Sequence, residues 1–221
     1  MSEIKLSADS GGGSVSLKGP ASSGADTAFV LPAADGSANQ VLKTDGSKNF
    51  GWTTPSAGKI LQVTNTTVTA TQTLSCSSAW VDSSITCSLT PSSASNKILI
   101  SMTATGEGNA ANQQRFEYRI KKAISGGATT YLVGAADGSR ILITGVTGDL
   151  SDNASNTASS FSLSNYLDSP STTSAVTYTI QITYDAAGSA GTYYLNRNAT
   201  DTDGSSTPRY ISWMTLMEVS G

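Results

Sequence analysis

Carboxylates and two cysteines are the side chains of this sequence most capable of chemistry, because the 221-residue chain contains no histidine. Ser-His-Asp triads, Cys-His pairs and histidine-ligated zinc sites all need an imidazole. Two carboxylates about 5–10 Å apart can cleave a glycoside without one. Most of the acidic residues, however, stand in Asp-Gly turns or in Ser- and Asn-rich loops. We therefore predict no catalytic residues, with a polysaccharide-cleaving enzyme as the alternative.

One acidic segment, Asp201-Thr202-Asp203-Gly204, resembles the start of a calcium loop, since alternating carboxylates can converge on a hard cation. An EF-hand requires a glutamate at the twelfth loop position, where this chain has Ser212. We expect an ordinary turn, with an irregular calcium site as the alternative. No bound metal or cofactor is predicted.

The two cysteines, Cys76 and Cys87, lack the spacing of a zinc site or a disulfide framework. Cys87 continues an alternating apolar row with Val81, Ile85 and Leu89, which predicts a strand that buries it. Two buried thiols are the first expectation. A bridge across a hairpin and a reactive thiol are the alternatives.

Charge argues against several classes of partner. The chain has 13 Lys and Arg against 16 Asp and Glu, a net charge of −3, and no basic stripe for nucleic acid or an anionic membrane surface.

Its first residues lack the apolar core of a signal peptide, and its longest uncharged run, residues 60–81, is too rich in Thr, Ser, Asn and Gln to span a bilayer. We expect a soluble protein made in a cytoplasm, without nucleic-acid partner or membrane insertion.

From Ile60 onward, apolar and polar residues alternate with a period of two. Phe116, Tyr118 and Ile120 alternate with charged residues, and the apolar residues of 176–184 alternate with Thr and Gln. Such segments are typical of half-buried strands in antiparallel sheets. No window favours a helix, because Leu, Glu and Lys are scarce. The pattern predicts an all-β head at residues 60–221, with about eight to ten strands in a jelly-roll-like antiparallel β-sandwich.

The last predicted strand, residues 210–219, has apolar residues on both faces. A strand of a two-layer sandwich is buried on both faces only where something covers its outer face. We expect a neighbouring subunit, with a local loop as the alternative. The candidate subunit-interface residues are Tyr210, Ile211, Trp213, Met214, Leu216 and Met217.

Residues 1–59 differ from the head, because their short apolar bursts are interrupted by Gly, Pro and Asp-Gly. This segment is too thin to bury a core of its own, so we expect an extended arm or short shaft that becomes ordered against other chains. Residues 53–58 read as a linker. The candidate docking residues are Leu31, Pro32, Val41, Leu42 and Trp52.

Recognition by a rigid sandwich is expected in its loops. Two polar segments, residues 107–112 and 148–157, are rich in amide and hydroxyl side chains, which both donate and accept hydrogen bonds and so suit glycan hydroxyls. Ordinary solvent loops are the alternative. The candidate receptor-contact residues are Glu107, Asn109, Asn112, Asp149, Asp152, Asn153 and Asn156.

The N-terminal segment contains the pattern LPxxDGSxxQVLxTDG, which begins at Leu31. With this pattern, most of residues 10–54 resemble a recurrent module of tail-fibre and other virion structural proteins of tailed phages, especially those of marine bacteria and cyanobacteria. Residues 80–100 and 194–219 resemble the early and late strands of the C-terminal domains of those proteins. Residues 105–190 match more weakly, as expected for variable loops.

The resemblance implies a homotrimeric virion appendage without enzymatic activity, attached to the particle through its N-terminal module. The expected partners are other copies of the chain, other virion proteins of the tail, baseplate or capsid, and host surface polysaccharide. The expected location is the virion surface, after assembly in the host cytoplasm. Because 221 residues leave little room for a shaft, a trimeric protein that decorates the capsid is the alternative to a short tail fibre or spike.

Overall fold

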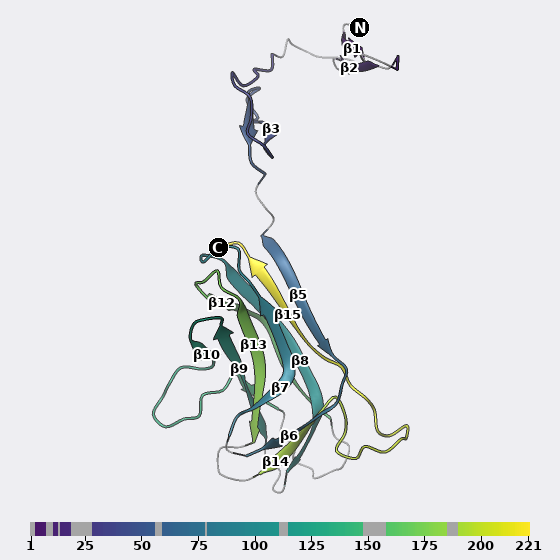
Figure 1. Cartoon of the computed structure of the whole chain (residues 1–221), viewed down its shortest axis with the longest axis vertical. Helices are drawn as coiled ribbons and strands as arrows, with labels where there is room; N and C mark the ends of the chain where they lie inside the picture. The colour runs from purple at the N-terminus through teal and green to yellow at the C-terminus, as the bar shows by residue number, and fades with distance from the viewer. Residues whose placement is uncertain are drawn as a thin grey trace. The chain divides into compact units, whose positions relative to one another are not determined.

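The computed structural model describes residues 3–7, 11–12, 14–18, 28–55, 59–77, 79–110, 115–147, 158–184 and 190–221. The chain divides into two compact units, Met1–Ser56 and Ala57–Gly221, which we call the N-terminal unit and the head. The regular elements within these ranges are all strands (Figure 1), so none is a helix long and apolar enough to cross a membrane.

The N-terminal unit contains two hairpins. Strands β1 (Glu3–Ser7) and β2 (Ser14–Lys18) pair antiparallel, as do β3 (Val41–Thr44) and β4 (Phe50–Thr53). The turn between β3 and β4 is organised by Asp45, whose carboxylate accepts hydrogen bonds from the Asn49 side chain and from the N–H groups of Ser47 and Asn49. These bonds, that from the Asn49 side chain foremost, lower the pKa of Asp45. The described residues of this segment therefore include two hairpins, whereas the sequence predicted an extended arm or short shaft.

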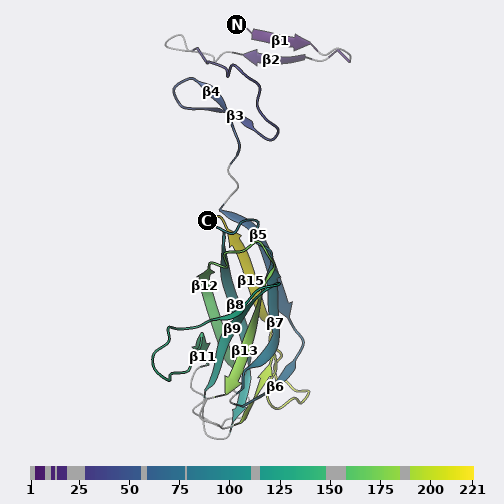
Figure 2. The same ribbon diagram turned by 60° about the vertical axis from the view of Figure 1, so that its left-hand side comes forward.

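One sheet of the head is built around its longest strand, β8. It contains β5 (Ile60–Val68), β6 (Gln72–Cys76), β8 (Lys97–Ala110), β12 (Ser159–Asp168), β14 (Gly191–Leu195) and β15 (Ser212–Val219). Strand β12 pairs along one edge of β8, while β15 and β14 pair with successive parts of the other edge. Beyond them, β5 pairs with β15 and β6 with β14, as Figures 1 and 2 show. We call this the six-stranded sheet.

The second sheet has five strands. It contains β7 (Val81–Leu89), β9 (Phe116–Ile124), β10 (Thr129–Leu132), β11 (Gly145–Val146) and β13 (Val176–Tyr184). Their order is β10-β9-β13-β7, with β11 pairing with β9 beside β10, and all pairs are antiparallel. The chain crosses repeatedly between the two sheets. Strands β5, β6, β8, β12, β14 and β15 belong to the six-stranded sheet, and the strands between them in sequence, β7, β9 to β11 and β13, belong to the five-stranded sheet.

Both sheets contribute to one hydrophobic core, which gives the head a sandwich-like arrangement. Its centre is a series of contacting aromatic rings. Tyr118 packs on Phe161, Phe161 on Tyr193, Tyr193 on Phe116 and Phe116 on Tyr184, with centroid separations of 4.9 to 5.5 Å. Tilted pairs at such distances are stabilising beyond the area that they bury.

Two buried carboxylates connect distant parts of the head. Asp168 accepts hydrogen bonds from Lys122 at 3.0 Å and from the Tyr178 hydroxyl at 2.7 Å. Burial alone would raise the pKa of Glu218, but hydrogen bonds from Asn96, Gln62 and Ser92 lower it to about 2. Glu218 thereby fastens the turn between β7 and β8 to the last strand.

Several sequence predictions are confirmed. The head is all-β and antiparallel, although its described residues form eleven strands from β5 to β15, more than the eight to ten predicted. Phe116, Tyr118 and Ile120 are buried in β9, as the alternation predicted. Cys76 and Cys87 are buried and unbridged, which confirms the first expectation for the cysteines.

The head has two distinguishable ends. At one, the Ser220 N–H donates to the Lys59 carbonyl at 2.8 Å, so the chain enters and leaves the head side by side; we call this the linker end. At the other, which we call the far end, β6, β8 and β13 finish and β9, β12 and β14 begin (Figure 1).

Candidate functional site

An open hollow of about 640 Å³ lies at the far end of the head. Its lining consists of Ser75, Cys76, Ser77, Asn109, Ala190, Gly191 and Thr192. The strand register places Thr192 of β14 between Ser75 of β6 and Asn109 of β8. Three short polar side chains thus form a row across three strands.

The chemistry of this hollow is that of hydrogen bonding. Hydroxyl and amide groups donate and accept hydrogen bonds but do not act as general acids or bases at neutral pH. Burial raises the pKa of the Cys76 thiol to about 11, against a smaller opposing effect of a backbone hydrogen bond from Tyr193. The thiol is therefore protonated at neutral pH and is not a nucleophile. The arrangement suits binding of a neutral polar ligand.

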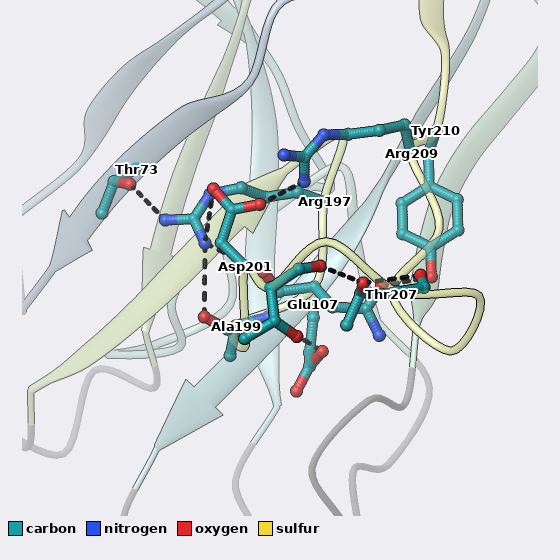
Figure 3. A network of polar contacts seen from close by, with 11 residues as sticks. Thr73, Glu107, Arg197, Ala199, Asp201, Thr207, Arg209 and Tyr210 are labelled. Atoms are coloured by element: carbon teal, nitrogen blue, oxygen red, sulfur yellow. Dashed lines mark hydrogen bonds and ion pairs between the residues drawn. The ribbon is translucent and has the colours of Figure 1, made fainter.

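The connection between β14 and β15, residues 196–211, folds back over the outward side of β8 (Figure 3). Asn196 anchors its start, because the Asn196 amide donates to the carbonyls of Val68 and Ala70 and accepts the Ser212 hydroxyl. Asn196 has a φ of 60°, a left-handed conformation that Asn tolerates better than most residues. Further along, the Tyr210 hydroxyl donates to Asn198 at 2.6 Å.

Arg197 and Asp201 hold the middle of this connection. The Arg197 guanidinium lies 4.3 Å from the centre of the Tyr194 ring and donates to Thr73 at 2.9 Å. Asp201 forms ion pairs with Arg197 and Arg209 (Figure 3). The Asp201 carboxylate is thus paired with two arginines of its own connection, in agreement with an ordinary turn. Among the residues with described positions, no cluster of three acidic or cysteine side chains could hold a metal ion.

The predicted receptor-contact residues have different positions. Asn109 is exposed and lines the hollow. Glu107 is 4% exposed, and its carboxylate accepts the N–H of Ala199 at 3.0 Å, so its assignment as a receptor contact is wrong. The reason is the connection over β8, which covers it. Asn112, Asp149, Asp152, Asn153 and Asn156 lie outside the described residues. Thr147 and Ala158, which flank the second predicted segment, adjoin far-end strands.

The predicted interface residues divide according to the alternation of β15. Met214 and Leu216 are fully buried in the core of their own chain, so their assignment to a subunit surface is corrected. Trp213 and Met217 point outward and are half-buried, and Ile211 is 53% exposed. Tyr210 is half-buried and belongs to the network of Figure 3.

Sequence reasoning missed most of the outward apolar surface beside Met217. In the register of the sheet, Met217 pairs with Val63 on one side and Leu99 on the other, and Leu99 pairs with Leu167. Val63 is 57% and Leu167 46% exposed. These four residues form a row across β5, β15, β8 and β12, which we call the apolar row. Their alternation was visible in the sequence, but the pairing that aligns them was not.

The predicted docking residues are mostly at the surface of the N-terminal unit. Leu31, Val41, Leu42 and Trp52 are exposed, and Pro32 is half-buried. Trp52 is nevertheless fixed, because its indole N–H donates to the Ala34 carbonyl at 2.8 Å. Its ring lies against Gly36, where a Cβ would come within 2.6 Å of the ring. Residues 28–55 leave most of their large apolar side chains exposed and are therefore suited to covering by another surface.

No protein-family model and no curated protein matches this chain in sequence.

Proposed function

We propose that this chain is a non-enzymatic structural protein of a tailed-phage virion, a short homotrimeric tail fibre or spike whose head contacts glycans on the host surface. The observation that carries this proposal is the orientation of β15. This strand turns Ser212, Met214, Leu216 and Glu218 inward and leaves the more apolar row of Trp213, Met217 and Val219 outside. Such an arrangement suits a chain whose outer face is covered by other copies.

The strand order supports a jelly roll. Three pairs of successive strands can each be counted as one interrupted strand. Strands β14 and β15 both pair with β8, strands β5 and β6 pair with β15 and β14, and strands β10 and β11 both pair with β9. The two sheets then each have four strands, and the chain passes between them as in a pair of Greek keys. Jelly rolls are common in viral capsid and lectin domains. That association is one of architecture and does not by itself imply a function.

The apolar row supports self-association through the outward face of the six-stranded sheet. Val63, Met217, Leu99 and Leu167 align across it, and Ile60 adds a further side chain that is 53% exposed. Contiguous exposed apolar surface of this kind marks interaction sites in soluble proteins. The number of subunits, three, comes from the resemblance of the sequence to phage appendage proteins.

The two ends of the head support a division of labour. The N-terminal unit, with its exposed apolar side chains, is joined to the linker end, where Lys59 and Ser220 meet. The polar hollow lies at the far end. Attachment through the N-terminal unit leaves the hydrogen-bonding groups of the far end available for a neutral glycan.

The proposal is tested on particles that contain this chain. Antibodies raised against residues 57–221 should label the tail of intact virions in electron micrographs, and quantitative mass spectrometry should give a copy number of a few trimers. Removal of residues 1–55 should leave a folded head that no longer joins particles. A chain that is absent from purified virions would overturn the proposal.

A capsid decoration protein is the second candidate, and the exposed apolar side chains of the N-terminal unit are as suitable for anchoring to a capsid as to a tail. In that case the antibodies label the capsid and the copy number is much higher. The same two measurements therefore separate the candidates.

A further inference from the structure

The outward face of the five-stranded sheet contains an arginine held by two aromatic rings. The guanidinium carbon of Arg119 lies 4.4 Å from the centre of the Trp80 ring and 3.6 Å from that of Tyr131. Trp80 comes from the segment before β7, Arg119 from β9 and Tyr131 from β10. The β9–β10 hairpin and the segment before β7, which is distant from it in sequence, thus meet at one cation.

Hydrogen bonds fix the orientation of this guanidinium. The Arg119 Nε donates to Gln181 Oε1 at 2.7 Å, and the Gln181 amide donates to Asp82 at 2.6 Å. Asp82 in turn forms an ion pair with Lys121. Gln181 is only 8% exposed, so its side chain has little freedom to move, and its hydrogen bond fixes the position of the Arg119 guanidinium.

The charge of this cluster is not balanced. Arg119 and Lys121 contribute two positive charges and Asp82 one negative charge, which leaves one positive charge. The nearest acidic residue along the strand, Glu117, is buried and pairs with Arg115 at 3.4 Å. Burial lowers the pKa of Arg119, an effect that Tyr131 and Asp82 oppose. Within the described part of the chain, no carboxylate forms an ion pair with Arg119.

The remaining donors of Arg119 suit one class of anion. Its Nε is used by Gln181, and the described residues provide no acceptor for its two Nη groups. A guanidinium edge binds a carboxylate through two parallel hydrogen bonds. The rings already restrict its side chain, so little further entropy is lost when an anion binds. Tyr131 is 41% exposed and offers an apolar surface beside the cation, as sugar-binding sites require.

We propose that Arg119, Trp80 and Tyr131 form a binding site for a carboxylated saccharide of the uronic-acid class. The carboxylate accepts hydrogen bonds from the Nη groups of Arg119, and the sugar ring lies beside the exposed part of Tyr131. This site is separate from the polar hollow, whose lining has no cation. The assignment rests on the proposed role in glycan contact and names the chemical class that one surface of the head recognises.

The test measures binding of trigalacturonic acid to the full-length chain by isothermal titration calorimetry or by chemical-shift changes. The fully methyl-esterified trisaccharide is the matched ligand control, because it keeps the sugar rings and lacks the charge. We expect binding of the acid, and at least about tenfold weaker binding of the ester, as for the loss of a charge-assisted hydrogen-bond pair.

Two variants test the residues. Arg119→Gln should weaken binding of the acid about tenfold or more, whereas Arg140→Gln, the same substitution at an exposed arginine paired with Asp137, should leave it unchanged. If Arg119→Gln does not fold, Tyr131→Leu at the sheet edge provides the measurement and should also weaken binding. Equal binding of acid and ester, unchanged binding in the folded variants, or no binding of the acid would each overturn the inference.

The outcome is distinct from that for the proposed function. If virions are labelled at the tail but trigalacturonic acid does not bind, only this inference fails. If the acid binds through Arg119 but the chain is absent from virions, the site remains and the virion proposal fails.

Discussion

The two sheets of the head share one core but present opposite chemistry on their outward faces. On the five-stranded sheet, polar side chains pair with one another across strands: Ser88 with Thr177 at 2.7 Å, Thr86 with Thr179 at 3.0 Å, and Asp82 with Gln181 at 2.6 Å. On the six-stranded sheet, Val63, Met217, Leu99 and Leu167 follow one another across four strands.

The outward groups of the five-stranded sheet find partners within their own chain, whereas the apolar row of the six-stranded sheet does not find them among the described residues. The polar pairs of the five-stranded sheet satisfy one another, and its exposed apolar side chains, Tyr131 and Val146, lie on the edge strands β10 and β11. Among the described residues, nothing covers Val63 and Leu167 of the apolar row, which are 57% and 46% exposed. Burial of apolar area stabilises by roughly 25 cal/mol per Å². We therefore expect the first face to be accessible to ligands and the second to be covered by other copies of the chain.

The largest expected effect is on association. Met217→Asp places a charge in the middle of the apolar row, where burial against another copy would leave it unpaired. We expect complete loss of the trimer at micromolar concentration, measured as molecular mass by light scattering. Ser88→Asp, on the outward face of the other sheet, is the control and should remain trimeric. A Met217→Asp protein that still forms trimers would show that this face is not the interface.

A second comparison uses two methionines of β15 that differ in orientation. Met214→Ala removes a fully buried side chain and should lower the free energy of unfolding by about 2–5 kcal/mol. Met217→Ala removes an outward one and should cost less than about 1 kcal/mol in a single chain. Chemical denaturation in a Leu99→Asp background, which is expected to be monomeric, measures both. Equal losses would contradict the orientation of the strand.

The buried carboxylate of β15 predicts a pH effect. The pKa of Glu218 in the folded chain, about 2, lies below the ordinary value of 4.5, so its contribution to stability is present above about pH 4.5 and is lost as the pH falls toward 2. Glu218→Gln should lower stability by about 1–3 kcal/mol at neutral pH. The difference from the unmodified chain should disappear near pH 2. Denaturation curves across this range provide the measurement, and a difference that does not change with pH would refute it.

The smallest expected effect is on the polar face. Replacement of Ser88 by Ala together with Thr177 by Val removes both members of a solvent-accessible hydrogen bond, which should change the free energy of unfolding by less than about 1 kcal/mol. Thermal denaturation measures it. A larger loss would indicate that this face also contributes to packing.

The regular strands could be predicted from the sequence because their two faces differ in polarity. In residues 116–121 and 176–184, apolar residues alternate with charged residues or with Thr and Gln, so only one orientation buries the apolar set. The same reasoning placed Cys87 correctly in the core. The pattern did not predict that polar residues of the opposite rows, among them Glu117, Gln181 and Thr183, are buried as well, so the expectation of half-buried strands was wrong for most of β13.

The orientation of β15 could not be predicted in this way. Its two rows are Ser212, Met214, Leu216 and Glu218 on one side and Trp213, Thr215, Met217 and Val219 on the other, and apolarity alone favours burial of the second. The first is buried because partners elsewhere in the chain satisfy its polar ends: Asn196 receives the Ser212 hydroxyl, and Asn96, Gln62 and Ser92 donate to Glu218. These partners are distant in sequence.

The candidate sites show the same limit. Glu107 stands in a polar, Gly-rich segment that is typical of an exposed loop, yet residues 196–211 cover it. No spacing in the sequence indicated that Trp80 would meet Arg119 and Tyr131. The last two lie on neighbouring strands of the β9–β10 hairpin, but Trp80 reaches them only because β13 joins β7 to β9 in the sheet.

An antiparallel β-structure without histidine catalysis follows from the amino-acid sequence alone, because composition and a period of two act locally, residue by residue. Which row of the last strand enters the core, which acidic residue is covered and which side chains surround Arg119 follow instead from the packing of the sheets. Each of these depends on hydrogen bonds or strand pairs between residues far apart in the chain, and the energy of such contacts is defined only once the sheets have formed.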